Sequence, residues 1–243
     1  MIWFYCKRSI KDALGHAILI IFPLILIFFF DYLYRSIDIE TGMGASSQSR
    51  LSVLTIGFAL TFQIYGSALS FETLAQDLYS PMGNRLFASP VEGRSLMLVI
   101  LVSSTIVSFL QTLVVVLFSH LVLGAVFSRL FWVLLILLLS VVFNQLLGSI
   151  ILLVTKGPKT ANMVTTIYGS IAPMLAGLYF PLPQNATFRF IRLYGTPMNL
   201  ANTASISVMD ANLMQGLAPL LVLMFLTMLL FLILKPMAGR VRV

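Results

Sequence analysis

Apolar stretches of membrane-spanning length alternate with short polar segments along the whole chain. Six such stretches lie near residues 17–35, 51–72, 95–124, 131–154, 161–180 and 216–234. Each can cross the roughly 30 Å hydrocarbon core of a bilayer as a helix, because a helix satisfies its own backbone hydrogen bonds where water is absent. The pattern predicts an all-α, polytopic membrane protein with six transmembrane helices in a single transmembrane domain, residues 1–243.

Two of the remaining segments have an amphipathic pattern of their own. Residues 1–15 interleave aromatic and aliphatic side chains with basic ones, which predicts an N-terminal helix lying in the membrane interface. Residues 181–215 alternate aromatic side chains with Arg189 and Arg192, which predicts an outer re-entrant segment that dips into the outer leaflet.

Composition is that of a membrane protein rather than a soluble or nucleic-acid-binding one. The chain is 59% hydrophobic and 9% charged, with a mean hydropathy of +1.01. Its net charge of +7 comes from 15 Lys and Arg residues that are scattered at the ends of the apolar stretches. We therefore assign this charge to membrane topology and expect no nucleic-acid partner.

The distribution of basic residues predicts the orientation in the membrane. With the N-terminus inside, ten of the 15 basic residues fall in inner segments: Lys7, Arg8, Lys11, Arg85, Arg94, Lys156, Lys159, Lys235, Arg240 and Arg242. Because cytoplasmic loops are enriched in Lys and Arg, this predicts a multi-pass protein of the cell membrane with both termini cytoplasmic. The first apolar stretch is too long for the core of a signal peptide, so we expect it to be retained as a span.

Few residues are of the kinds that carry catalytic chemistry. Cys6 is the single cysteine, and His16 and His120 belong to no metal-binding motif, so we expect no metal site. No Gly-Lys dipeptide occurs, and a phosphate-binding loop of the Gly-Lys-Ser/Thr kind is therefore missing. The chain is expected to hold no cofactor. If ATP drives the protein, another chain must bind the nucleotide.

A polar island bounded by prolines lies between the second and third apolar stretches. Residues 77–94 read Asp-Leu-Tyr-Ser-Pro-Met-Gly-Asn-Arg-Leu-Phe-Ala-Ser-Pro-Val-Glu-Gly-Arg. A short cytoplasmic helix over residues 82–89 would offer Leu86 and Phe87 to an apolar cleft of a partner and Arg85 to a charged contact. Such a helix can transmit the movement of a soluble subunit to the spans on either side.

This island resembles the coupling segment of permeases of the type 2 exporter family of ATP-binding-cassette transporters. In that family an acidic residue and a Gly precede Leu-x-x-x-Pro-Val and a basic residue follows. The matching positions are Asp77, Gly83, Leu86, Pro90, Val91 and Arg94. A second likeness begins at the basic turn Lys156-Gly157-Pro158-Lys159 and continues at Ala176-Gly177-Leu178-Tyr179-Phe180-Pro181, where the family has Ser-Gly-x-x-Phe-Pro with Ser in place of Ala176.

The resemblance implies a permease that carries out no bond chemistry itself. A separate ATP-binding-cassette ATPase subunit would bind ATP and Mg²⁺ and drive outward transport. It would dock on the coupling residues Arg85, Leu86, Phe87, Ser89 and Pro90. A second permease, identical or a sister chain, would complete the pathway within the membrane lipid.

Polar residues inside the spans are the candidates for the pathway. Since spans two and five line the route in the resembling family, we assign Gln63, Tyr65, Tyr168 and Pro173 to it. Hydrogen-bonded packing within the chain is the interpretation for Gln111, Asn144 and Gln145. The pathway candidates are apolar, amide or phenolic, so the expected cargo is amphipathic or hydrophobic: a drug, a lipid-like molecule or an antimicrobial peptide.

Two other classes of function stay open. A non-transporting membrane scaffold or sensor subunit would be insensitive to substitution of Gln63 or Tyr65. A membrane enzyme acting on a lipid would need clustered acids, bases or metal ligands, and His16, Glu72 and His120 form no evident cluster. The glycosylation sequon at Asn185 is interpreted as a chance match.

Overall fold

The computed structural model describes residues 2–10, 12–37, 49–79, 93–180, 182–183 and 185–240. Within those ranges the chain folds into helices and contains no strand, which confirms the predicted all-α class. The helices are α1 (Ile2–Ile10), α2 (Ala13–Ile37), α3 (Arg50–Tyr79), α5 (Gly93–Leu121), α6 (Leu130–Thr155), α7 (Pro158–Leu175), α8 (Ala186–Tyr194), α9 (Pro197–Met209) and α10 (Leu213–Arg240).

Five of these helices are long and apolar enough to cross a membrane, namely α2, α3, α5, α6 and α10. They coincide with five of the six predicted spans. The remaining predicted span, 161–180, falls on α7 and on the turn that follows it. The 18 residues of α7 include Lys159 and Asn162, and the helix ends just before Gly177, whose φ of +75° lies in the left-handed region. A spanning role for α7 stays a prediction.

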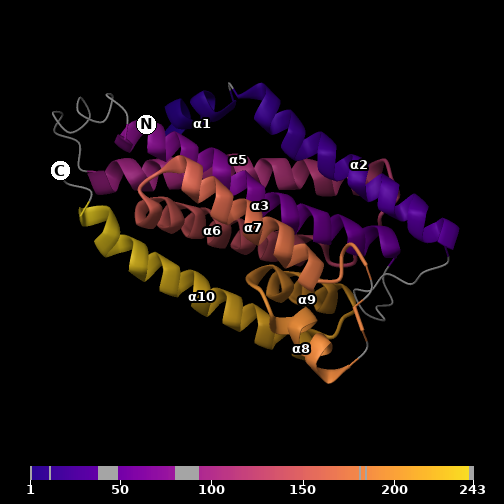
Figure 1. Ribbon diagram of the computed structural model, residues 1–243. Coiled ribbons are helices and arrows are strands. Elements are labelled where there is room, and N and C mark those ends of the chain that lie inside the picture. The colour runs from indigo at the N-terminus through magenta and orange to yellow at the C-terminus, as the bar shows by residue number, and fades with distance from the viewer. Residues whose placement is uncertain are drawn as a thin grey trace.

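The central helix of the bundle is α3, which α2, α5, α6 and α7 surround (Figure 1). From Leu51 to Ile64 every side chain except that of Phe62 is buried. A helix that is apolar on all sides is expected to be enclosed in this way. By contrast, α2 and α10 lie on the outside of the bundle and expose large apolar side chains such as Phe28 and Phe225. Their exposed faces suit contact with lipid.

The two ends of the bundle carry different elements (Figure 1). At one end, which we name the terminal end, lie α1 and the last turns of α10. At the opposite end, the far end, lie α8 and α9. The start of α1 and the end of α10 therefore lie at the same end of the bundle, as the predicted topology requires. The assignment of this end to the cytoplasm stays a prediction.

Most of the predicted interfacial helix is α1. Its Tyr5 and Cys6 are buried, whereas Trp3 and Phe4 are 79% and 64% exposed. The buried side packs on α5, where Ser103 Oγ donates a hydrogen bond to the carbonyl oxygen of Ile2 at 3.2 Å. A helix with one packed side and exposed aromatic rings on the other is suited to the membrane interface.

The predicted re-entrant segment, 181–215, contains two helices at the far end. No residue of α8 is buried, and Asn185 caps this helix by accepting a hydrogen bond from the backbone N–H of Phe188 at 2.8 Å. In contrast, α9 is buried along most of its length against α6 and α10. The fully buried Asn199 donates through Nδ2 to the carbonyl oxygens of Leu175 and Ile191 at 3.3 and 2.7 Å. One amide thus joins the ends of α7, α8 and α9.

Candidate coupling and pathway site

The predicted coupling residues lie between α3 and α5. All five fall outside the described residues: Arg85, Leu86, Phe87, Ser89 and Pro90. The described chain stops at Tyr79 of α3 and resumes at Gly93 of α5. Around these two flanks, α1 packs against α5 and α3. The candidate site can therefore be built from the helices that carry the coupling segment.

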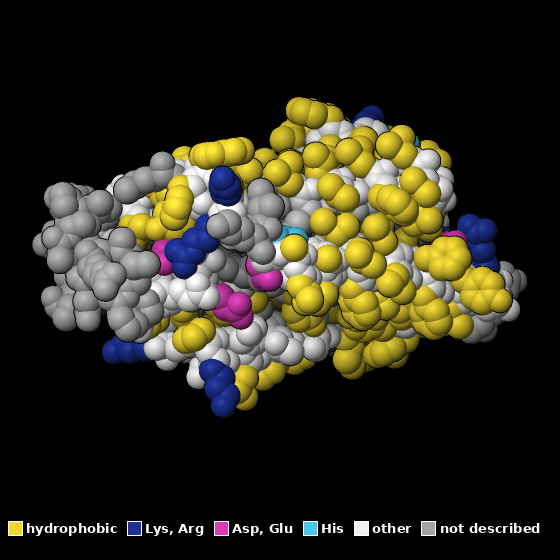
Figure 2. All heavy atoms as spheres, turned by 90° about the horizontal axis from the view of Figure 1, so that it is seen from above, with side chains coloured by type: hydrophobic (Ala, Val, Ile, Leu, Met, Phe, Trp, Pro, Cys, Tyr) yellow, Lys and Arg dark blue, Asp and Glu magenta, His cyan; other side chains and the backbone are white. Residues whose placement is uncertain are grey.

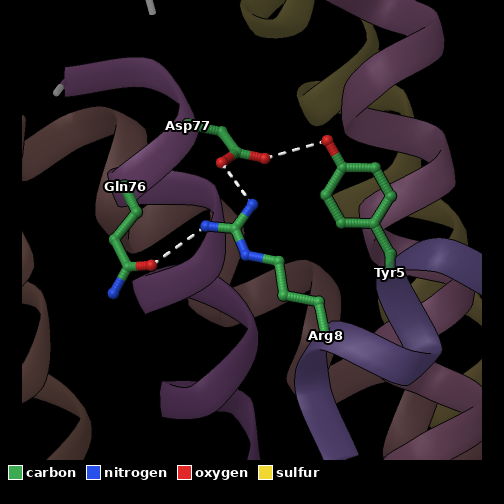
Figure 3. Close-up of polar contacts among 4 residues, drawn as sticks. All are labelled: Tyr5, Arg8, Gln76 and Asp77. Carbon is green, nitrogen blue, oxygen red and sulfur yellow. Dashed lines mark hydrogen bonds and ion pairs between the residues drawn. The ribbon is translucent and has the colours of Figure 1, made fainter. Parts of the chain in front are cut away.

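A hydrogen-bonded cluster ties α1 to the last turn of α3 (Figure 3). Asp77 Oδ2 accepts a hydrogen bond from Tyr5 Oη at 2.9 Å, and Asp77 Oδ1 forms an ion pair with Arg8 Nη1 at 2.7 Å. Arg8 Nη2 also donates to Gln76 Oε1 at 3.0 Å. We name these four residues the α1–α3 clasp. The clasp fixes the interfacial helix to the helix end that leads into the coupling segment.

The clasp holds a carboxylate away from water. The side chain of Asp77 is 2% exposed and that of Arg8 is 33% exposed. A buried charge of this kind is tolerated because its partners stay in place, and losing one partner is strongly destabilising. Burial, followed by the hydrogen bond to Asp77, raises the pKa of Tyr5 to about 12. The Tyr5 hydroxyl therefore stays protonated at neutral pH and remains a donor to Asp77.

The helix α7 lies along α3, and we name this contact the α3–α7 seam. Small side chains of α7 turn toward the bundle about once per helical turn: Ala161, Thr165, Gly169 and Ala172, all buried. A Cβ added at Gly169 would lie 2.8 Å from Cζ of Tyr65. The two helices therefore approach closely at Tyr65, as small residues allow in membrane proteins.

We expect Gly169→Ala to lower the thermal stability of the purified chain, because the new methyl group has to displace the Tyr65 ring. Overpacking of this kind costs about 1–3 kcal/mol. Thermal unfolding in detergent measures the effect. The matched control is Gly93→Ala, where an added Cβ meets nothing within 4 Å. Equal unfolding temperatures for the two variants would contradict the close approach, and adding Tyr65→Ala to Gly169→Ala should restore part of the loss.

Two further pathway candidates, Tyr168 and Pro173, lie in the C-terminal half of α7. The Tyr168 hydroxyl is buried close to the backbone of Met198 at the start of α9. Pro173 is buried, and its carbonyl oxygen accepts a hydrogen bond from the backbone N–H of Leu178 at 3.0 Å. Both residues thus anchor the C-terminal half of α7. Tyr65 of α3 lies beside the same helix, next to Gly169. The structure therefore places three of the four pathway candidates, Tyr65, Tyr168 and Pro173, in or against α7.

Aromatic rings of α2, of α3 and of the turn after α7 extend the seam. They belong to Phe22, Phe30, Phe58, Phe62, Tyr65 and Tyr179. The centroids of Phe62 and Tyr65 are 5.8 Å apart, and those of Phe30 and Phe58 are 5.4 Å apart. The sequence reasoning selected only Tyr65 from this set, because a Phe within an apolar span has no pattern that distinguishes it from ordinary core residues.

Gln63 contacts different helices from Tyr65. Its Nε2 donates to Thr112 Oγ1 of α5 at 3.2 Å and to the carbonyl oxygen of Leu137 of α6 at 3.3 Å. Two positions along a helix are separated by about 200°, so the side chains of Gln63 and Tyr65 point to opposite sides of α3. The structure does not bring Gln63 to the α3–α7 seam, and its assignment to a pathway stays a prediction.

The residues assigned to packing make their contacts inside the chain. Gln111 Nε2 lies 2.6 Å from His16 Nδ1 and so links α5 to α2. Asn144 Nδ2 donates to the carbonyl oxygen of Ser140, one turn earlier in α6, at 3.0 Å. Gln145 is buried in the same helix. These placements agree with the packing interpretation.

Comparison with known families agrees with this arrangement. The sequence profile of the ABC-2 type transporter family matches residues 1–209, from α1 to the last residue of α9. The chain belongs to the ABC-2 type transporter family. Comparison with curated proteins and with solved structures gave no match. The resemblance inferred from the coupling segment is thereby confirmed, and the protein is a membrane permease component of an ABC transporter.

The outward face of α7 is apolar in this ABC-2 permease. Met163, Ile167 and Ile171 are 59%, 57% and 48% exposed, while Thr166 and Ser170 lie exposed among them. The opposite side of the helix carries the small buried residues that pack on the bundle. One side of α7 is therefore committed to its own chain, and the other is available to lipid or to a second permease.

Three of the four clasp residues were not selected from the sequence, and one of them, Gln76, directly precedes Asp77 in α3. Asp77 was selected through the family motif, but Arg8 was counted only as a topology signal and Tyr5 was not considered. Both lie on an amphipathic helix some seventy positions away in the chain, as the separations of 69 and 72 residues show. The available signal was an acidic residue at the end of a span together with a basic interfacial helix, which does not by itself identify the pair.

Proposed function

We propose that this ABC-2 permease exports an amphipathic or hydrophobic molecule across the cell membrane, as one half of a pathway driven by a separate ATPase subunit. The observation that carries the proposal is the family match over residues 1–209, which includes both the clasp and the α3–α7 seam. The ATPase would bind ATP and Mg²⁺, and a second permease, identical or a sister chain, would complete the pathway. In this proposal α7 is the sixth span and both termini are cytoplasmic.

Movement would enter the permease at the coupling segment. Its residues Arg85, Leu86, Phe87, Ser89 and Pro90 would contact the ATPase, and a shift there would be passed directly to α3 and α5. The clasp would carry α1 along with α3. Because α3 is tightly enclosed, it can pass a displacement to α7 through the contact between Tyr65 and Gly169 instead of absorbing it.

The pathway would run along α7, where two permeases face each other. The apolar exposed face of this helix, interrupted by Thr166 and Ser170, would offer an amphiphile both a sliding surface and weak hydrogen bonds. Tyr65, Tyr168 and Pro173 would set the position of α7, and the aromatic rings of α2 and α3 would support it. Between Met163 and Ile171 this face carries no charged side chain, which favours an amphipathic cargo over an ion or a sugar.

A disulfide across α7 tests this function directly. In a Cys6→Ser background with the ATPase reconstituted in vesicles, Ile171→Cys should crosslink two identical permeases on oxidation and stop ATP-driven transport of a fluorescent amphiphile. Reduction should restore transport. For a sister pair, the second Cys is placed at the matching position of the sister chain. The matched control is Asn144→Cys, since this position is buried in α6 and should neither crosslink nor block transport.

Two outcomes would contradict the proposal. One is amphiphile movement that is equal with and without ATP. The other is crosslinking of Asn144→Cys in preference to Ile171→Cys, which would place the contact between permeases elsewhere.

A further inference from the structure

A groove opens at the terminal end between the last turns of α3 and the first turn of α7. It is an open groove with a volume of about 500 Å³, and it is lined by Glu72, Ala75, Gln76, Tyr79, Pro158, Lys159 and Asn162. This volume falls within the range of roughly 300–1,000 Å³ typical of small-molecule sites. The groove therefore has room for a polar headgroup together with the first part of an alkyl chain.

Two side chains of opposite charge, Glu72 and Lys159, line the groove. Ion pairs in the described residues join Arg8 to Asp77 and Arg35 to Asp31, so Glu72 and Lys159 line the same groove without pairing with each other. Asn162 Nδ2 donates to Glu72 Oε1 at 3.0 Å and holds this carboxylate in place. Asp12, just before α2, adds a second negative charge close enough to act on Glu72.

The position of the groove suits a molecule that lies partly in lipid. Ala75, Pro158 and the ring of Tyr79 supply apolar surface beside the charges. On the face shown in Figure 2, acidic and basic side chains lie toward the two ends of the molecule, including the terminal end, and hydrophobic side chains cover the middle. The groove therefore lies where a span emerges from the apolar layer, which is the level of lipid headgroups.

We propose that this groove binds the zwitterionic headgroup of an amphiphile, with a primary amine at Glu72 and a phosphate at Lys159. The proposal deepens the proposed function, on which it rests, by assigning the class of cargo received at the terminal end. Glu72 is the stronger of the two contacts, because it is partly buried and oriented by Asn162, whereas Lys159 is exposed. A purely anionic amphiphile would be repelled by Glu72 and Asp12.

The groove is also connected to the clasp. Gln76 lines the groove and at the same time accepts the hydrogen bond from Arg8 Nη2. A headgroup in the groove would therefore contact the same helix turn that holds α1. Gln76 therefore links occupancy of the groove to the position of the last turn of α3, which leads into the coupling segment.

The test is binding of an acyl-labelled fluorescent lysophosphatidylethanolamine to the purified full chain in dodecyl maltoside, followed by fluorescence anisotropy. The matched ligand is the N-acetylated form of the same lipid, which keeps the phosphate and loses the positive charge. We expect the free amine to bind about tenfold more tightly, as one charge-assisted hydrogen bond allows. Glu72→Gln, which retains an acceptor for Asn162, should remove that preference.

A second pair of variants separates the anionic contact from general charge effects. Lys159→Gln should weaken binding of both lipids by about twofold to threefold, in keeping with an exposed charge. Lys235→Gln, an exposed lysine on α10, is its control and should have no effect. Equal binding of the two lipids to the unaltered chain would overturn the proposal, as would an unchanged preference in Glu72→Gln. The assay contains neither ATP nor an ATPase, so its failure leaves the transport proposal standing, and failure of transport leaves the binding result intact.

Discussion

Leu86→Asp and Phe87→Asp should each release the ATPase subunit from the permease. In the proposed complex these side chains enter an apolar cleft of the ATPase, where an unpaired carboxylate costs about 3 kcal/mol or more, a loss of at least about a hundredfold in affinity. The measurement is the amount of ATPase that co-purifies with the permease, together with ATP-driven transport in vesicles. Because both positions lie outside the described residues, the expectation rests on the sequence pattern and on the family.

Ser95→Asp is the matched control for this loss. It introduces the same charge close by, on an exposed position in the first turn of α5, where a negative charge is favoured by the helix dipole. It should therefore retain the complex. The thermal stability of all three variants should equal that of the unaltered chain, since Leu86 and Phe87 lie between the spans and Ser95 is exposed in the first turn of α5. A full complex and full transport in Leu86→Asp and Phe87→Asp would show that this segment is an ordinary loop.

The long apolar helices were predictable from the sequence because hydrophobic length alone determines them. Continuous apolar runs identify α2, α3, α5, α6 and α10, and their ends lie near Lys, Arg, Asn or Gly. The case of α7 is less definite, because Lys159, Asn162 and Ser170 reduce its apolar character while its buried side keeps it in the bundle. Hydropathy measures affinity for lipid and carries no information on whether a helix is covered by protein.

At the far end and in the clasp, the sequence pattern did not predict which helices contact each other. The pattern of 181–215 indicated amphipathic character but not that α9 is enclosed by α6 and α10, because this burial results from packing against helices distant in the sequence. Likewise, the sequence shows that Tyr65 is large and Gly169 is small, but it does not show that the two residues are in contact. Contacts between helices far apart in sequence require the angle and depth of packing, which local patterns do not specify.

Substitutions in the α1–α3 clasp should strongly lower the stability of the chain. Arg8→Ala leaves the carboxylate of Asp77 buried without its cation, so it should lower the free energy of unfolding by about 2–3 kcal/mol, toward the low end for a buried pair because Arg8 is one-third exposed. Asp77→Ala removes the buried charge itself. It should therefore lower the free energy of unfolding by less in the Arg8→Ala background than in the unaltered chain. The resulting coupling energy, measured by thermal or denaturant unfolding of all four chains, should be about 2 kcal/mol.

The other ion pair of the described residues provides the matched control. Arg35 Nη2 lies 3.0 Å from Asp31 Oδ2 at the opposite end of α2, with Arg35 69% exposed. The same cycle there should give about 0.5 kcal/mol, because solvent screens an exposed pair one helical turn apart. Equal coupling energies at the two sites would mean that the clasp is only a surface ion pair.

The clasp should also affect transport beyond its effect on stability. If α1 moves with α3, Arg8→Ala in the reconstituted complex should retain ATP hydrolysis but move severalfold less amphiphile per ATP, because the displacement at the coupling flank is no longer shared with α1. Tyr5→Phe keeps the ring in place and removes only one donor to Asp77, so its effect on the same ratio should be smaller. A loss of hydrolysis and transport in equal proportion would assign the clasp to folding alone, since a merely structural defect reduces the number of active complexes and leaves the transport achieved per ATP unchanged.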